Sequence, residues 1–190
     1  FDAASRLFLT MSAGFIVGLL SSGFVATRLT HRWTVALAVG LGGVMMIAVG
    51  LAPSLPLLHA AIVIAGLVTG LYPGSGVASV ASLVPDFHRG KALAIHETGP
   101  NLAFILAPLV SAAAAPVIGW RGVVTAAGAA AIVVAAAFAV FGKADDQRSE
   151  PPHFKNVGFI IRNRSFWVVS LLLTVAAMAA MGVYSILPTY

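Results

Sequence analysis

The sequence predicts an all-α integral membrane protein, and two observations lead to that prediction. Of its 190 residues, 59% are hydrophobic and 9% are charged, with a mean hydropathy of +0.99. Soluble domains contain about 45–50% apolar and about 25% charged residues, so a soluble fold would leave many of these side chains facing water. The apolar residues also gather in long runs, each close to the roughly 20 residues that a helix needs to cross a bilayer.

Six transmembrane helices are expected from these runs. The runs are rich in Ala, Leu and Gly, lack the period-two alternation of strands, and offer nothing that would close a barrel. The expected spans cover approximately residues 7–26, 34–52, 57–83, 92–115, 123–141 and 166–187. Short links at 27–33, 53–56 and 116–122 should hold neighbouring helices antiparallel, whereas the long polar segment 143–165 should form a linker.

Basic residues are distributed unevenly between the links. Nine of the eleven Lys and Arg residues fall in the first, third and fifth links, and the other two are Arg6 and Arg121. Because Lys and Arg concentrate in cytoplasmic loops, these three links, including 143–165, are predicted to be cytoplasmic. The formal charge of +5 then fits anionic lipid headgroups rather than nucleic acid. The tryptophans fall at predicted membrane edges, as interfacial anchors do: Trp33, Trp120 and Trp167.

The first link resembles a motif of the major facilitator superfamily of secondary transporters. It reads Gly23-Phe-Val-Ala-Thr-Arg28-Leu-Thr-His-Arg32, and its Gly23, Arg28 and Arg32 match that motif. Thr27 stands at the acidic position of the motif and Thr30 at its second glycine, so the match is partial. In the family this region takes part in closing the cytoplasmic side.

Three further places extend the resemblance over nearly the whole chain. They are Pro85-Asp-Phe-His-Arg89-Gly-Lys-Ala92, then Ala107-Pro108-Leu109 followed by Gly119-Trp120-Arg121, and finally Arg164-Ser-Phe166-Trp167 with Leu187-Pro188. The resemblance implies that the spans are helices two to seven of a twelve-helix fold. Residues 1–142 would form most of the N-terminal bundle, and 166–190 the first helix of the C-terminal bundle. One helix would precede this fragment and several would follow it. The resemblance also implies a cytoplasmic gate at Gly23, Arg28, Arg32 and Arg89.

Glu97 is the sharpest candidate for a functional group inside the membrane. It lies eight residues beyond Arg89, about 12 Å along the helix axis from the cytoplasmic edge. A carboxylate at that depth needs water, a cation or a proton, which is the property that a proton-coupled carrier uses. His96 flanks it, and Asn101 lies one turn further on the same face. The alternative is a structural ion pair with a basic residue of a neighbouring helix.

A polar stripe is expected on the third span. Tyr72, Ser75 and Ser79 recur at three- and four-residue spacing and should project from one side of a helix, followed by Ser82. Two interpretations are open: the stripe lines an aqueous cavity, or its small residues let helices approach closely in lipid. Pro73 should bend the helix at this depth.

Two glycine pairs, Gly14 with Gly18 and Gly66 with Gly70, are expected to serve helix packing. The chain contains no Cys and no close group of His, Asp and Glu, so neither a metal site nor a cofactor is predicted.

The expected function is that of a secondary carrier that moves a small polar or amphipathic solute by alternating access. A gradient, with protons as the candidate ion, would supply the energy, because no Gly-x-x-x-x-Gly-Lys-Ser/Thr loop is present. The expected location is the bacterial inner (plasma) membrane, and the expected partners are lipid and solute, without nucleic acid. One alternative is a non-transporting sensor or scaffold on a transporter fold. The other is an intramembrane hydrolase using Ser75, although no histidine is expected opposite it, so no catalytic residue is predicted.

Overall fold

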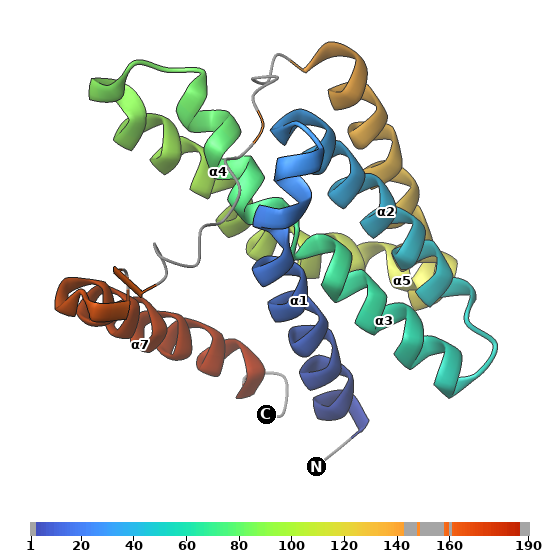
Figure 1. The fold of residues 1–190 in the computed structure, drawn as a ribbon. Helices are drawn as coiled ribbons and strands as arrows, with labels where there is room; N and C mark the ends of the chain where they lie inside the picture. The colour runs from blue at the N-terminus through green and yellow to red at the C-terminus, as the bar shows by residue number, and fades with distance from the viewer. Residues whose placement is uncertain (1–2, 143–147, 149–157, 160, 187–190) are drawn as a thin grey trace. The chain divides into compact units, whose positions relative to one another are not determined.

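A computed structural model describes residues 3–142, 148, 158–159 and 161–186 (Figure 1). Within these ranges, side chains are described from residue 6 to residue 178. The described residues form helices joined by short links, without a strand among them. By its contacts the chain divides into two units, Phe1–Pro151 and Pro152–Tyr190. The helices are α1 (Ala3–Arg28), α2 (His31–Leu51), α3 (Leu55–Thr69), α4 (Tyr72–Ser82), α5 (Arg89–Phe141) and α7 (Arg164–Ile186), with a 3-10 turn η1 (Asp86–His88) before α5.

Four helical segments are long and apolar enough to cross a membrane: Arg6–Arg28, His31–Leu51, Leu55–Ser82 and Asp86–Phe141. The described apolar part of the last helix, Arg164–Met178, is shorter. The all-helical, apolar architecture agrees with the sequence prediction, whereas the count of six spans stays a prediction. Six spans require that the long α5 cross the membrane twice and that α7 cross it as well.

α5 is interrupted at a single residue. It has 53 residues, which would make a straight helix about 80 Å long, more than twice the thickness of a bilayer core. Gly119 has φ 70° and ψ 163°, a conformation that glycine adopts without a steric penalty. The two parts of α5 leave this point in different directions, and the second runs alongside α2 (Figure 1). The loop predicted at 116–122 is therefore wrong in its extent, because one glycine suffices for the change of direction.

The third predicted span is two helices rather than one. α3 ends at Thr69 and α4 begins at Tyr72. Pro73 has no N–H to donate to the carbonyl of Thr69, and its ring crowds that carbonyl. Leu71 N instead bonds to Val68 O at 3.1 Å, a tighter turn than that of an α-helix. The irregularity predicted beside Pro73 is therefore present as a break between α3 and α4.

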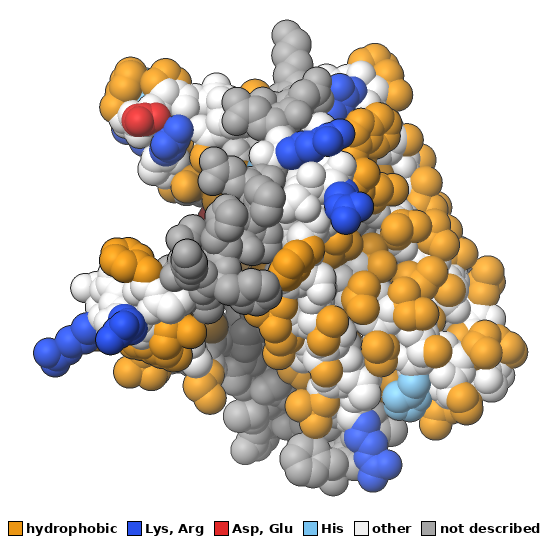
Figure 2. All heavy atoms as spheres, in the orientation of Figure 1, with side chains coloured by type: hydrophobic (Ala, Val, Ile, Leu, Met, Phe, Trp, Pro, Cys, Tyr) orange, Lys and Arg blue, Asp and Glu red, His pale blue; other side chains and the backbone are white. Residues whose placement is uncertain are grey.

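The interior of the first unit is made of small residues. Large apolar side chains such as Phe8, Leu20 and Phe24 are exposed instead. Figure 2 shows hydrophobic side chains over much of the visible surface along α2 and α3. A water-soluble protein has the opposite distribution, whereas lipid accepts this one. The buried apolar residues are Ala26, Val35, Ala36, Ala38, Ala52, Ala61, Ala65, Val68 and Ala135.

α1 and α3 pack through the two predicted glycine pairs. A Cβ added to Gly18 would overlap the carbonyl oxygen of Leu67 and lie 3.1 Å from the Cα of Gly70. Likewise, Cβ atoms added to Gly14 or Gly66 would overlap backbone carbonyls of the opposite helix. The two backbones are too close for any side chain between them, so the packing role of these glycines is confirmed.

Arginines close both ends of the pair formed by α2 and the second part of α5. Arg32, at the start of α2, donates to the carbonyl oxygen of Ala139 at the end of α5. Arg121 donates to the carbonyl oxygens of Gly50 and Ala52 at the end of α2, at 3.2 and 2.8 Å. The last carbonyls of a helix have no partner within it and carry partial negative charge. Each guanidinium therefore caps the other helix of the pair.

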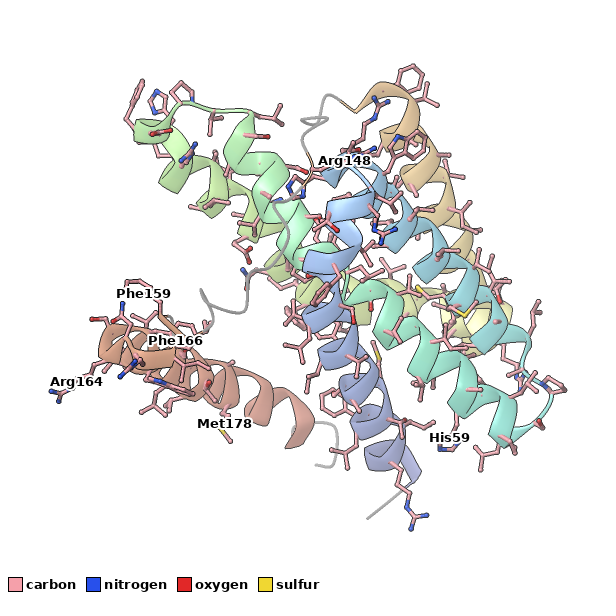
Figure 3. All side chains as sticks on the ribbon, in the orientation of Figure 1. His59, Arg148, Phe159, Arg164, Phe166 and Met178 are labelled. Atoms are coloured by element: carbon pink, nitrogen blue, oxygen red, sulfur yellow. The ribbon has the colours of Figure 1, made fainter. Side chains whose placement is uncertain are left out.

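The helix ends divide the described basic residues of the first unit between the two ends of the bundle. Arg28 ends α1, Arg32 begins α2 beside the end of α5, and Arg89 begins α5 beside the end of α4. Arg121 lies at the opposite end of α2. His59, labelled in Figure 3, lies on the first turns of α3, near the end of the bundle at which α2 finishes.

The second unit is described by α7 and the residues just before it. Trp167 Nε1 donates to Ile161 O at 2.7 Å, and Ser165 N donates to Asn163 Oδ1 at 2.9 Å. Arg164 is the first residue of α7 (Figure 3), two residues before the predicted start of the last span. Most of the linker predicted at 143–165 lies outside the described residues.

Replacing Gly18 with leucine is expected to force α1 away from α3, because its side chain has no space beside Leu67. We expect a loss of at least about 1–3 kcal/mol of stability, measured as thermal unfolding of the detergent-purified full-length protein. The matched control is Gly23→Leu on the same helix, where an added Cβ meets nothing within 4 Å. Equal melting temperatures for the two variants would contradict the packing described for α1 and α3.

Replacing Arg121 with glutamine is expected to uncap α2 and lower stability by about 1–3 kcal/mol, since buried carbonyls lose a charged donor. The guanidinium also stacks on Trp120, with its carbon 4.9 Å from the ring centroid. The control is Arg6→Gln, an exposed arginine at the start of α1. If both variants unfold at the same temperature as the unmodified protein, the cap contributes nothing to stability.

Candidate functional site

The strongest candidate site is a cavity of about 330 Å³ inside the first unit, where α2, α4 and both parts of α5 meet. Its polar lining consists of Tyr72 and Ser79 from α4 and His96 from α5. A mainly apolar concavity with a few polar groups is the usual form of a small-molecule site. The apolar walls are Val35, Ala36, Val39, Val80, Leu83, Val134, Ala135 and Phe138.

Tyr72 and His96 join α4 to the first part of α5. Tyr72 Oη lies 3.4 Å from His96 Nε2, and the rings are stacked with centroids 6.2 Å apart and planes at 27°. A phenol both donates and accepts, and an imidazole nitrogen does either according to its tautomer. The pair therefore presents the cavity with an adaptable hydrogen-bonding end. The break at Pro73 fixes where α4 begins and hence where Tyr72 projects.

The serine stripe of α4 fits both interpretations that the sequence left open, because one part of it serves packing and another part lines the cavity. Ser75 and Ser79 are 1% and 6% exposed, whereas Ser82 is exposed. Ser79 Oγ donates to Ser75 O at 2.7 Å, and Ser82 Oγ donates to Ser79 O at 2.9 Å. Hydroxyls bonded to their own helix serve close packing. Ser79 nevertheless contributes to the cavity wall.

Ser75 has a histidine opposite it, and the expectation that it would have none is wrong. His31 Nδ1 lies 3.3 Å from Ser75 Oγ. α2 begins at His31, three residues before the predicted start of the second span, so a residue assigned to a link lies against α4. A nucleophilic serine must be accessible to its substrate and paired with a base. The 1% exposure of Ser75 therefore fits a packing contact rather than catalysis.

Glu97 and Asn101 lie outside the cavity. Both are exposed, and Asn101 Nδ2 donates to the backbone oxygen of Glu97 at 2.6 Å rather than to its carboxylate. Within the described part of the chain, Glu97 forms no ion pair, and the one ion pair found there joins Arg89 to Asp86 at 3.0 Å. The structural tie considered for Glu97 is not seen there. His96, the neighbour of Glu97, is the candidate that faces the cavity.

The four residues of the expected cytoplasmic gate have separate surroundings. Arg32 caps α5, and Arg89 Nε donates to Ala81 O of α4 at 3.2 Å. Gly23 and Arg28 are exposed, with open space around Gly23. Among the residues with described side chains, no hydrogen bond or ion pair joins members of this set to one another. Likewise, no three His, Asp or Glu side chains of that set lie close enough to hold a metal ion.

The walls contributed by α2 and the second part of α5 were not predicted from the sequence. Apolar residues that face a cavity have the same pattern as those that face lipid, so hydropathy does not separate them. The only available signal is the small size of Ala36, Gly76 and Ala135 at positions where three helices meet.

The family model described as Major Facilitator Superfamily matches residues 2–190. Among curated proteins, none matches the chain. The match covers nearly the whole sequence, and the apolar helices with their small-residue interior agree with a multi-pass membrane protein. The chain therefore belongs to the major facilitator superfamily, whose members are membrane transporters.

Proposed function

We propose that this protein carries a small solute across the membrane by alternating access, driven by a proton gradient. Membership of a transporter family supports the general function. The observation that supports a solute site in this unit is the Tyr72–His96 pair lining an otherwise apolar cavity. Ionisable groups placed at membrane depth are costly and are therefore expected to have a function.

Glu97 is proposed as the coupling group beside this site, with Asn101 supporting its helix face. It follows His96 directly, so the two side chains project about 100° apart around the helix. Because the two residues are adjacent, a proton gained or lost at Glu97 changes the electrostatic field at His96. Tyr72 completes the proposed set through its contact with His96, and Ser79 through its place in the cavity wall. The buried Ser75, in contact with His31, is proposed to support the packing of α4 beside them.

The proposed topology has six crossings, with α5 crossing on either side of Gly119. The links rich in Lys and Arg would face the cytoplasm of a bacterial inner membrane. Residues 1–142, 143–165 and 166–190 are proposed as most of one bundle, a linker and the first helix of a second bundle. Arg32 and Arg89 would lie at the cytoplasmic gate together with Gly23 and Arg28.

Replacing Glu97 with glutamine is expected to lower uptake driven by a pH gradient by about tenfold or more, because the amide takes up no proton. Solute counterflow, which requires no net proton movement, should continue in the same proteoliposomes. The matched control is Asp146→Asn, a carboxylate of the predicted linker. Unchanged gradient-driven uptake in the glutamine variant would remove Glu97 from the coupling mechanism.

Replacing Ser75 with alanine is expected to leave transport within about twofold of the unmodified protein, since its hydroxyl is buried against His31 and does not line the cavity. The same preparation tests the hydrolase alternative with a fluorophosphonate probe, which labels nucleophilic serines. Labelling that disappears in the alanine variant would favour the hydrolase. Solute binding without any uptake would favour a sensor.

A further inference from the structure

We propose that the cavity between α2, α4 and α5 binds a compact, mainly apolar molecule that has one hydrogen-bonding end and carries no charge. This inference deepens the proposed function by naming the chemical class of the ligand. It rests on that function only for the step in which the ligand crosses the membrane, because binding is a separate property of the cavity.

The size and walls of the cavity define the body of the ligand. Its volume of about 330 Å³ lies at the lower end of the range for small-molecule pockets. The wall opposite α4 comes from Val35 and Val39 of α2 and from Val134 and Phe138 of α5. Apolar surface buried against such walls contributes about 25 cal/mol per Å². A small aromatic or branched aliphatic group therefore fits this part best.

The polar end of the ligand is set by Tyr72 and His96. Their heteroatoms are 3.4 Å apart, at the long end of hydrogen-bond distances, so little is lost when a ligand atom replaces this contact. The phenol donates, and the imidazole donates or accepts. A hydroxyl of the ligand can satisfy both groups, because it donates to one and accepts from the other.

The charge of the ligand follows from what the walls lack. Among the cavity-lining residues that the structure describes, no Asp, Glu, Lys or Arg is present. An ammonium or a carboxylate group would lose its hydration there without gaining an oppositely charged partner from the walls, which is costly. Glu97 does not line the cavity, so its carboxylate is not part of the wall. Charged solutes are therefore disfavoured relative to neutral ones.

The test uses three probes that share a phenyl ring and a two-carbon chain: 2-phenylethanol, phenylacetate and 2-phenylethylamine. Binding is measured by calorimetry on the detergent-purified full-length protein. We expect saturable binding of the alcohol, and at least about tenfold weaker binding of the acid and of the amine, because both would bury an unpaired charge. Equal affinity of either charged probe, or no saturable binding of the alcohol, would overturn the proposal.

Variants locate the binding in the cavity. Ala135→Phe fills the cavity and should abolish binding of the probes. If this variant fails to fold, Val39→Phe fills the cavity from the side of α2 and should have the same effect. Tyr72→Phe keeps the ring and removes the hydroxyl, so it should weaken binding of the alcohol several-fold. The control is Met46→Phe, which lies in a neighbouring apolar cavity of about 350 Å³ and does not line this one. Probe binding that survives both filling variants would overturn the site.

Failure of the ligand proposal can be distinguished from failure of the transport proposal. Probe binding with no uptake of any solute into proteoliposomes would refute transport and leave the site. Uptake of a solute that these probes do not inhibit would support transport and refute this cavity as its site.

Discussion

The fold depends on the close approach of helix backbones at small residues. Lipid tails are as apolar as leucine, so burying a large apolar side chain between helices gains little in a membrane. Gly18 and Gly70 bring α1 against α3, and a Cβ on Gly43 would lie only 2.6 Å from the carbonyl oxygen of Gly128 where α2 meets α5. Large side chains such as Leu20 are left to face the lipid.

The cavity is a consequence of the same constraint. Where an aromatic ring lies between helices, their backbones cannot close, and space remains around it. Gly76 lies one turn after Tyr72, and a Cβ there would be 3.0 Å from the ring carbon Cζ. The glycine therefore accommodates the ring against its own helix. Pro73 sets the start of α4 and so directs the ring toward His96.

Hydropathy and small-residue spacing predict the helices and the α1–α3 contact because both depend on composition at fixed periods. They indicate a link at 116–122, but not that the helix is interrupted at Gly119 alone, since one glycine with positive φ leaves no periodic signal. The contact between His31 and Ser75 was missed through a boundary error of three residues. Glu97 was ranked first for its charge, yet the orientation of the helix places His96 in the cavity instead. A sequence indicates depth along a helix better than it indicates which neighbour a face meets.

The contacts around the cavity differ in strength, and this difference has a consequence for ligand binding. α2 and the second part of α5 are joined by glycine contacts and by charged donors at both ends, the stronger kind of hydrogen bond. α4 is separated from α3 by the break at Pro73. Its described side-chain links to the cavity helices include two histidine–hydroxyl contacts of 3.3 and 3.4 Å and, at its last turn, the donation from Arg89 Nε to Ala81 O. A ligand that enters the cavity competes with the Tyr72–His96 contact and leaves the arginine caps intact. Adjustment to the ligand should therefore be taken up by α4, whereas the α2–α5 pair acts as the fixed wall.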